Sequence, residues 1–222
     1  MLSKNSVRKI ILSRLKRLRD STRLELQNSM LNSRLQSILN SRGGVWAGFM
    51  PLWNEPNLLE TYKKLAGQIH FVFPRINGNE IHFFSPDGEP DFQKGPLGIL
   101  EPKLENSKRV LASELTGVIV PGLGFDSKGS RLGRGMGFYD RFLKSCRAEK
   151  IGVCFQTQFS KEPLEVQEHD EKVNRLVTEN LVLRFATLKH GIQASAFEQA
   201  ENVTLHFARG MDLCAFSERN FL

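Results

Sequence analysis

The run RLGRGMGFYD at residues 131–140 combines the residue types that bind an anion. Its glycines permit positive φ angles and a close approach of the backbone to a ligand. Its arginines supply planar guanidinium donors that match phosphate oxygens. The glycines are Gly133, Gly135 and Gly137, and the arginines are Arg131 and Arg134. The spacing indicates an anion-binding loop, with a simple glycine turn before a helix as the alternative.

The residues that follow the loop predict a helix whose first turn faces the same ligand. Phe138, Phe142 and Cys146 recur every four residues and mark the inner face of this helix. Its first N–H groups and its dipole favour an anion. Mg²⁺ prefers one or two carboxylates together with phosphate oxygens, so we expect Asp140 to hold a magnesium ion on such an anion.

Two named phosphate motifs do not fit the run. A dinucleotide fingerprint needs GxGxxG directly after a strand, but Gly137 stands one position early. A Walker A loop needs a lysine after its second glycine, and Ser130 occupies that position in GFDSKGS (124–130). The loop therefore belongs to neither class.

Hydrophobic periodicity predicts the elements that must position the loop. Two amphipathic helices at about 4–19 and 22–41 form an N-terminal helical pair. Later strands alternate with helices, including a helix at 55–67 that begins at Pro56. The strands are expected at 45–50, 69–73, 80–84, 117–121, 150–155 and 175–185. This alternation predicts an α/β fold, with a mainly parallel open sheet and helices on both faces.

Length and composition predict one α/β domain at 1–185 and a C-terminal extension of unknown role at 186–222. The Gly- and Pro-rich stretch 85–103 is expected to be a long surface loop that faces the substrate. The chain lacks the 18-residue apolar run of a membrane helix. Three widely spaced cysteines fit no disulfide framework and favour the cytoplasm. A monomer is favoured.

The net positive charge of the chain comes from its first predicted helix. Seven of the 31 basic residues lie in 1–19, which holds no acidic residue, so the other 203 residues carry 24 basic and 24 acidic side chains. An RNA-associated protein that uses this helix is one alternative, but the balance elsewhere argues against a nucleic-acid-binding surface. An organelle transit peptide is another alternative for this acid-poor segment.

Together these residues resemble the 5-formyltetrahydrofolate cyclo-ligase (5,10-methenyltetrahydrofolate synthetase) family over about residues 4–180. The most specific match is VPGLGFDSKGSRLGRGMGFYDRFL (120–143), and weaker matches follow the order of the chain. They are Lys4-x-x-x-Arg8, MPLWNEP (50–56), FPR (73–75), GILEP (98–102) and HDEKVNRLVTE (169–179). The resemblance implies an enzyme that uses ATP and Mg²⁺ to phosphorylate the formyl oxygen of 5-formyltetrahydrofolate. N10 then closes the ring, which gives the 5,10-methenyl product, ADP and phosphate.

The resemblance also implies the site residues. The ATP-binding set is Lys4, Arg8, Arg131, Leu132, Gly133, Arg134, Gly135, Met136, Gly137, Phe138 and Tyr139. The folate-binding set is Arg8, Met50, Glu55, Arg134, Gly135, Met136, Gly137 and Phe138. The metal-binding pair is Asp140 and Asn174. From the residues alone, Glu55 would be an acid at a helix N-terminus.

Three positions depart from the family pattern. Met136 lacks the amine of a lysine found there in some members, and Phe138 lacks the hydroxyl of a usual tyrosine. Asn174 stands where the family commonly has a metal-binding aspartate, and Asp170 or Glu171 would be its substitute. These departures motivate a second hypothesis, a relative that binds folate or nucleotide without turnover.

Overall fold

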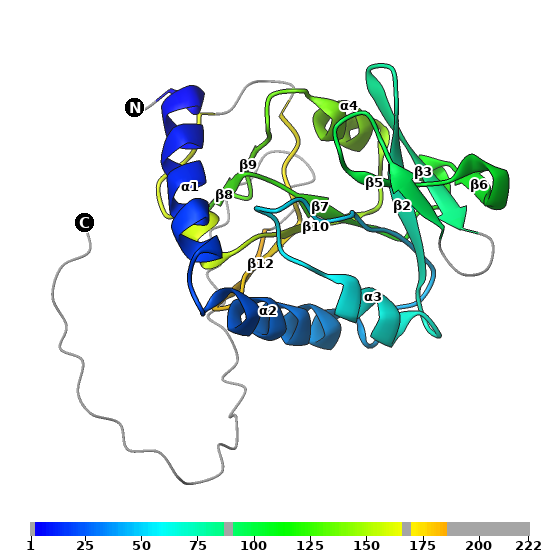
Figure 1. Ribbon diagram of the computed structural model, residues 1–222, viewed down its shortest axis with the longest axis horizontal. Helices are drawn as coiled ribbons and strands as arrows, with labels where there is room; N and C mark the ends of the chain where they lie inside the picture. The colour runs from blue at the N-terminus through cyan, green and yellow to red at the C-terminus, as the bar shows by residue number, and fades with distance from the viewer. Residues whose placement is uncertain (1–2, 87–90, 166–169, 186–222) are drawn as a thin grey trace, which may run out of the picture.

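The computed structural model describes residues 3–86, 91–165 and 170–185 (Figure 1). The helices are α1 (Lys4–Arg19), α2 (Leu24–Leu39), α3 (Leu59–Leu65) and α4 (Phe138–Ser145). No helix in these ranges is long and apolar enough to cross a membrane. The proposed extension at 186–222 lies outside the described residues.

A mixed sheet with the strand order β13-β12-β10-β7-β1-β2-β3-β6 forms the centre of the fold. Its inner strands are parallel: β12 (Arg175–Val177), β10 (Glu149–Val153), β7 (Gly117–Pro121), β1 (Val45–Ala47) and β2 (His70–Asn77). The outer strands run antiparallel to their neighbours: β13 (Val182–Arg184), β3 (Glu80–Pro86) and β6 (Ser107–Val110). The predicted α/β class and mainly parallel sheet are confirmed.

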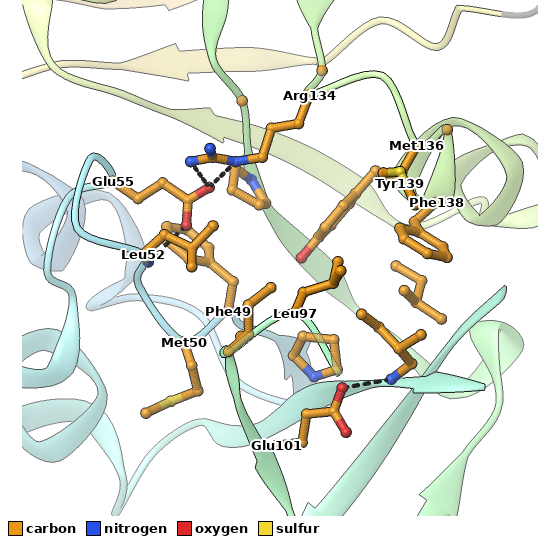
Figure 2. A pocket seen from close by; sticks show the side chains of 18 of the residues that line it. Phe49, Met50, Leu52, Glu55, Leu97, Glu101, Arg134, Met136, Phe138 and Tyr139 are labelled. Carbon is orange, nitrogen blue, oxygen red and sulfur yellow. Dashed lines mark hydrogen bonds and ion pairs between the residues drawn. The ribbon is translucent and has the colours of Figure 1, made fainter. Parts of the chain in front are cut away.

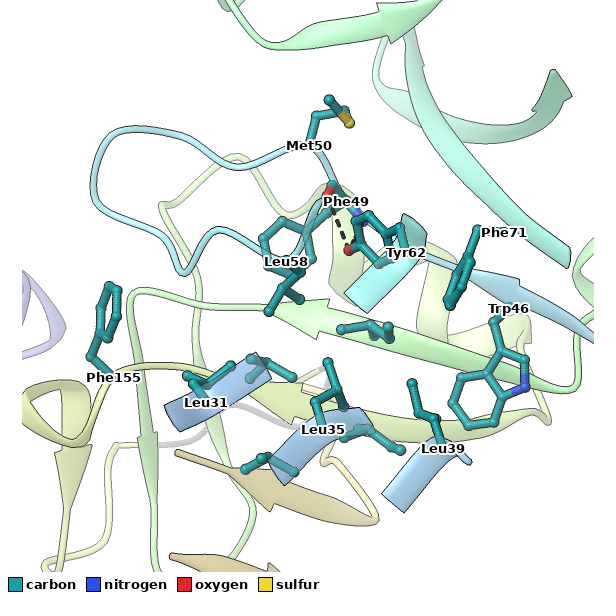
Figure 3. Packing of buried hydrophobic residues seen from close by; sticks show 14 of the residues in the cluster. Leu31, Leu35, Leu39, Trp46, Phe49, Met50, Leu58, Tyr62, Phe71 and Phe155 are labelled. Atoms are coloured by element: carbon teal, nitrogen blue, oxygen red, sulfur yellow. Dashed lines mark hydrogen bonds between the residues drawn. The ribbon is translucent and has the colours of Figure 1, made fainter. Parts of the chain in front are cut away.

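Two hydrophobic clusters cover opposite faces of the sheet because successive strand side chains alternate. Ile119 of β7 packs in one cluster with α1, α2 and α3, whereas its neighbours Val118 and Val120 pack in the other with α4. Figure 3 shows the first cluster, in which the leucines of α2 lie beneath the sheet. Helices therefore lie on both faces, as predicted.

Short pieces of chain hold the site beside this frame. The strands β8 (Gly124–Asp126), β9 (Arg131–Leu132) and β11 (Phe159–Ser160) form a small sheet that leads into the glycine loop. The 3-10 helices are η1 (Leu104–Asn106), η2 (Ala112–Glu114) and η3 (Gln156–Gln158), and α1 packs against η3.

Several predicted boundaries were wrong for identifiable reasons. The helix predicted to begin at Pro56 begins at Leu59, where Asn57 Oδ1 accepts the Leu59 N–H at 3.1 Å. The stretch 85–103 holds a hairpin of β4 (Phe92–Lys94) and β5 (Leu100–Pro102). The single strand expected at 175–185 is two antiparallel strands, because Thr178 Oγ1 accepts the N–H groups of Asn180 and Leu181 in a turn.

Candidate functional site

An open pocket lies where the strands β1 and β7 end. Phe49 and Met50 of the pocket follow β1. Pro121 is the last residue of β7, and Gly122 follows it. The pocket is therefore at the carboxyl edge of the parallel strands. Ligands of open α/β sheets bind at this edge. The lining is mostly apolar, and its charged members are Glu55, Glu101, Arg131 and Arg134 (Figure 2).

The glycine loop forms one wall of this pocket. Gly135 and Gly137 have φ angles of 104° and 68°, whereas Gly133 is not in the left-handed region. At Gly133 a side chain would be crowded for another reason, since a Cβ would lie 3.2 Å from the Arg131 guanidinium nitrogens. Gly137 caps α4 in the left-handed conformation and leaves the first N–H groups of the helix without a side-chain cap. These groups suit an anion, as the sequence predicted.

Arg131 lies behind the loop and is held by the protein. Its Nη2 donates to Asp140 Oδ1 at 2.6 Å and its Nη1 donates to the Pro121 carbonyl at 3.3 Å. The Arg131 side chain is 5% exposed and that of Asp140 is 16% exposed. The guanidinium predicted to bind phosphate is therefore largely engaged in an internal ion pair, and only its Nε, which is buried, has no partner among the described residues.

Arg134 reaches across the pocket mouth to the loop that follows β1. Its Nε and Nη2 both donate to Glu55 Oε1, at 3.3 and 3.0 Å, and Nη2 also donates to Asn54 Oδ1. The other Glu55 oxygen accepts the Leu52 N–H at 3.0 Å. Glu55 therefore closes a turn four residues before α3, and it is not the helix N-terminal acid that its sequence context favoured.

Two of the basic residues of α1, Lys4 and Arg8, contact the segments around the glycine loop. Arg8 Nε donates to the Gly133 carbonyl at 3.1 Å, and Arg8 Nη1 donates to Asn5 Oδ1 at 2.7 Å. Lys4 Nζ forms an ion pair of 2.6 Å with Asp170 Oδ2. The structure thus brings Arg8 against the glycine loop and places Lys4 beside the segment that begins at residue 170.

The sequence analysis included Glu101 only as part of the GILEP match (98–102), yet its carboxylate shapes the pocket. Glu101 is 2% exposed, and its Oε1 accepts the Ile76 N–H of β2 at 3.0 Å. Arg75 Nε lies 3.9 Å from Oε2 of the same carboxylate. Glu101 fastens the β4–β5 hairpin to β2, and Leu97 at the hairpin turn then lines the pocket. The GILEP motif was a signal that could have suggested this anchor.

The two residues predicted to bind the metal, Asp140 and Asn174, both have partners within the protein. Asp140 Oδ1 accepts from Arg131 Nη2 at 2.6 Å, and Asn174 Oδ1 accepts the N–H of Lys150 at 2.8 Å. Lys150 pairs with Val118 near the beginning of β7, whereas Arg131 donates to the carbonyl of Pro121 at the end of that strand. Within the described ranges no three His, Cys, Asp or Glu side chains form a metal cluster.

These features define an α/β protein with a small-molecule site, built from an apolar pocket and a basic glycine loop at the carboxyl edge of the sheet. The model of the 5-formyltetrahydrofolate cyclo-ligase family matches residues 1–179, and the chain belongs to this family. The resemblance noted from the glycine loop is thereby confirmed.

Individual relatives agree with this assignment. A 5-formyltetrahydrofolate cyclo-ligase of Mus musculus is 39% identical over 69 residues, which cover 28% of this chain and 34% of the relative. A probable 5-formyltetrahydrofolate cyclo-ligase of Schizosaccharomyces pombe is 36% identical over 101 residues, which cover 39% of this chain and 49% of the relative. The chain thus spans between about a third and half the length of these two relatives in the matching segments. The solved structure of 5,10-methenyltetrahydrofolate synthetase from Aquifex aeolicus has a TM-score of 0.70 and 29% identity, covering 87% of this chain and 97% of that one.

Proposed function

We propose that this protein is an ATP-dependent 5-formyltetrahydrofolate cyclo-ligase. The observation that supports the proposal is that an apolar pocket and an anion-binding loop lie next to each other. An apolar pocket shares a wall with a basic glycine loop at a helix N-terminus. A reaction that transfers a phosphoryl group from ATP onto folate needs both substrates to meet at such a wall.

ATP is proposed to bind between α1 and the glycine loop. Arg8 already lies against Gly133, and Lys4 is one helical turn away on the same face. The uncapped N–H groups that begin α4 would hold a phosphate, and the two cations would neutralise its charge. Phosphoryl transfer depends on such positioning and charge neutralisation, since it needs no protein nucleophile.

The pterin ring of 5-formyltetrahydrofolate is proposed to lie in the apolar pocket, near Met50 and Glu55. The Glu55 carboxylate would accept hydrogen bonds from the N–H edge of the ring. Arg134 occupies Glu55 Oε1 in the structure, so a ring that binds there must share or displace this guanidinium. Arg134 would then be free to turn toward the phosphates of ATP. Binding of the pterin ring would in this way complete the set of cations at the ATP site.

The proposed reaction is the one that the family resemblance implies. The formyl oxygen forms a bond to the γ-phosphorus of ATP, and the bond to ADP breaks. The N10 nitrogen then bonds to the activated formyl carbon and loses its proton, and phosphate leaves with the former formyl oxygen. The chain contributes by holding the two substrates in contact and by excluding water from the apolar pocket.

Magnesium is expected to enter as MgATP, held chiefly by the phosphate oxygens. Asp140 accepts from Arg131 and Asn174 accepts from a backbone N–H group, so we propose that the chain holds the ion without the two-residue site that the family resemblance implied. The amide oxygen of Asn174 accepts a hydrogen bond from the Lys150 N–H, and the carboxylate of an aspartate could accept the same bond. Its departure from the family pattern therefore does not by itself argue for a protein without turnover.

The test is to mix the protein with 5-formyltetrahydrofolate and MgATP, and to record both methenyl absorbance and ADP release. Equal amounts of methenyl product and ADP are expected. Binding of both ligands by calorimetry without ADP release would instead support the non-catalytic hypothesis. Absence of both product and binding at micromolar enzyme would exclude the proposal. We further propose that the protein acts as a cytoplasmic monomer on free substrates and not on nucleic acid, which light scattering and an RNA gel shift would check.

A further inference from the structure

The protein contains two tyrosines, and their hydroxyl groups differ in a way that points to a ligand contact. The Tyr62 hydroxyl is buried and satisfied: it accepts the Phe49 N–H and donates to the Phe49 carbonyl, both at 3.1 Å. The Tyr139 hydroxyl is also buried, but no group in the described part of the chain hydrogen-bonds to it. Buried polar groups without a partner are rare, and each requires an explanation.

The position of Tyr139 supplies one. Tyr139 lies in the first turn of α4 and lines the pocket, and Figure 2 shows its ring extending inward with the hydroxyl toward the middle of the cavity. The ring is packed from behind, since the Arg131 guanidinium carbon lies 5.6 Å from its centroid. A ring held in this way directs its hydroxyl at the space that the pterin is proposed to occupy.

The electrostatics of the pocket make this hydroxyl a donor. Burial raises the pKa of Tyr139 well above its ordinary value, and the Glu55 carboxylate adds to the rise. The hydroxyl therefore keeps its proton at neutral pH. A protonated, desolvated O–H group that faces an apolar cavity recognises an oxygen acceptor on the ligand.

We infer that Tyr139 binds the folate substrate, with its hydroxyl donating a hydrogen bond to a carbonyl oxygen of the bound molecule. This inference rests on the proposed function and revises the role that the family resemblance gave to Tyr139, which was ATP binding alone. The carbonyl belongs either to the pterin ring or to the formyl group.

Stability and binding should respond to loss of this hydroxyl in opposite directions. An unsatisfied buried donor costs free energy in the empty protein, so Tyr139→Phe should leave the free energy of unfolding unchanged or raise it. The same change removes a hydrogen bond from the folate complex. We expect the dissociation constant for folate to rise by about tenfold, which corresponds to one buried hydrogen bond.

The experiment compares Tyr139→Phe with Tyr62→Phe, the matched variant at the other tyrosine. Urea unfolding measures stability, and calorimetry without the second substrate measures the dissociation constants for 5-formyltetrahydrofolate and for MgATP. Tyr62→Phe should lower stability, because its hydroxyl has two backbone partners. Tyr139→Phe should not lower stability, should weaken folate binding and should leave the affinity for MgATP unchanged.

A third ligand separates the two candidate carbonyls. Tetrahydrofolate lacks the formyl group but keeps the ring carbonyl. An equal loss of affinity for both folates would place the hydrogen bond on the ring, whereas a loss confined to 5-formyltetrahydrofolate would place it on the formyl oxygen. The inference would be overturned by unchanged folate affinity in Tyr139→Phe, most directly if the affinity for MgATP fell instead.

Failure of the proposed function has a different result. If the unmodified protein bound neither folate, the cyclo-ligase proposal itself would be wrong, and the comparison of variants would show only the difference in stability. Folate binding by the unmodified protein that is unaffected by Tyr139→Phe would reject only the inference about the hydroxyl.

Discussion

Arg131 and Asp140 form an ion pair of 2.6 Å between Nη2 and Oδ1, at the junction of the glycine loop and α4. Both side chains are largely withdrawn from water, so the removal of either partner leaves a buried charge without compensation. The pair thereby fixes the end of the loop relative to the first turn of the helix.

Asp140→Ala should therefore lower the free energy of unfolding by about 3 kcal/mol, because it strands the Arg131 guanidinium. The sequence analysis assigned Asp140 to magnesium, and a residue with that role alone would leave stability unchanged when it is replaced. Urea unfolding measures the change. The double variant Arg131→Met with Asp140→Leu serves as the control, since removal of both charges should recover most of the lost stability. Full stability of the single variant would show that the pair contributes nothing.

Glu55→Gln should weaken folate binding roughly tenfold, because an amide is a poorer acceptor for the N–H edge of a pterin than a carboxylate. The ion pair with Arg134 would also be lost. Steady-state kinetics would show a raised KM for 5-formyltetrahydrofolate. Glu60→Gln is the matched control, since Glu60 is exposed on α3. Equal effects at both positions would mean that Glu55 has no specific part in the pocket.

Lys4→Met should raise the KM for ATP about tenfold, as expected for loss of one charged phosphate contact. Lys9→Met provides the comparison, because Lys9 lies on the same helix and is exposed. An equal change in the two variants would point to a general effect of charge on nucleotide association. A change in folate KM without a change in ATP KM would place Lys4 at the wrong substrate.

Gly137→Ala should disturb the loop and lower ATP affinity. The residue has a φ of 68°, and a Cβ would lie 2.7 Å from Arg141 Nη1. We expect a loss of stability of about 1–2 kcal/mol from backbone strain. Gly67→Ala is the control, since nothing lies within 4 Å of its Cβ position and its φ is not in the left-handed region. Calorimetry with ATP and urea unfolding would record the two effects separately.

Asn174→Asp discriminates between the two interpretations of the metal site. A shared site with Asp140 predicts that an added carboxylate lowers the Mg²⁺ concentration needed for turnover. The hydrogen bond from the Lys150 N–H to Asn174 Oδ1 predicts an unchanged requirement, because aspartate would accept the same bond. Titration of Mg²⁺ at fixed ATP gives the answer.

The glycine loop and the α/β frame could be predicted because their causes are local. Positive φ at Gly135 and Gly137 and the hydrophobic periods of α1 and β7 are properties of short stretches. The roles of charged residues could not be predicted in this way. Whether Arg131 faces a phosphate or a carboxylate depends on where α4 packs. The packing of α4 is determined by residues that are distant from Arg131 in the sequence.

Glu55 illustrates the same limit at a boundary. Pro56 and the following apolar residues indicated a helix from residue 55, but the helix begins at Leu59, whose N–H donates to Asn57 Oδ1 in the turn before it. The resulting turn carries Glu55 toward Arg134, 79 residues further along the chain.

The β4–β5 hairpin has a consequence for how this family can diversify. The strands of the main sheet build the floor of the pocket, whereas the hairpin turn supplies Leu97 as part of its roof. Glu101 anchors the hairpin to β2, and Gly95 permits the close approach to that carboxylate, which a Cβ would meet at 2.2 Å. Changes of sequence or length between Gly95 and Glu101 can therefore alter the part of the pocket formed by the hairpin turn. The strands of the main sheet and the glycine loop need not change with it.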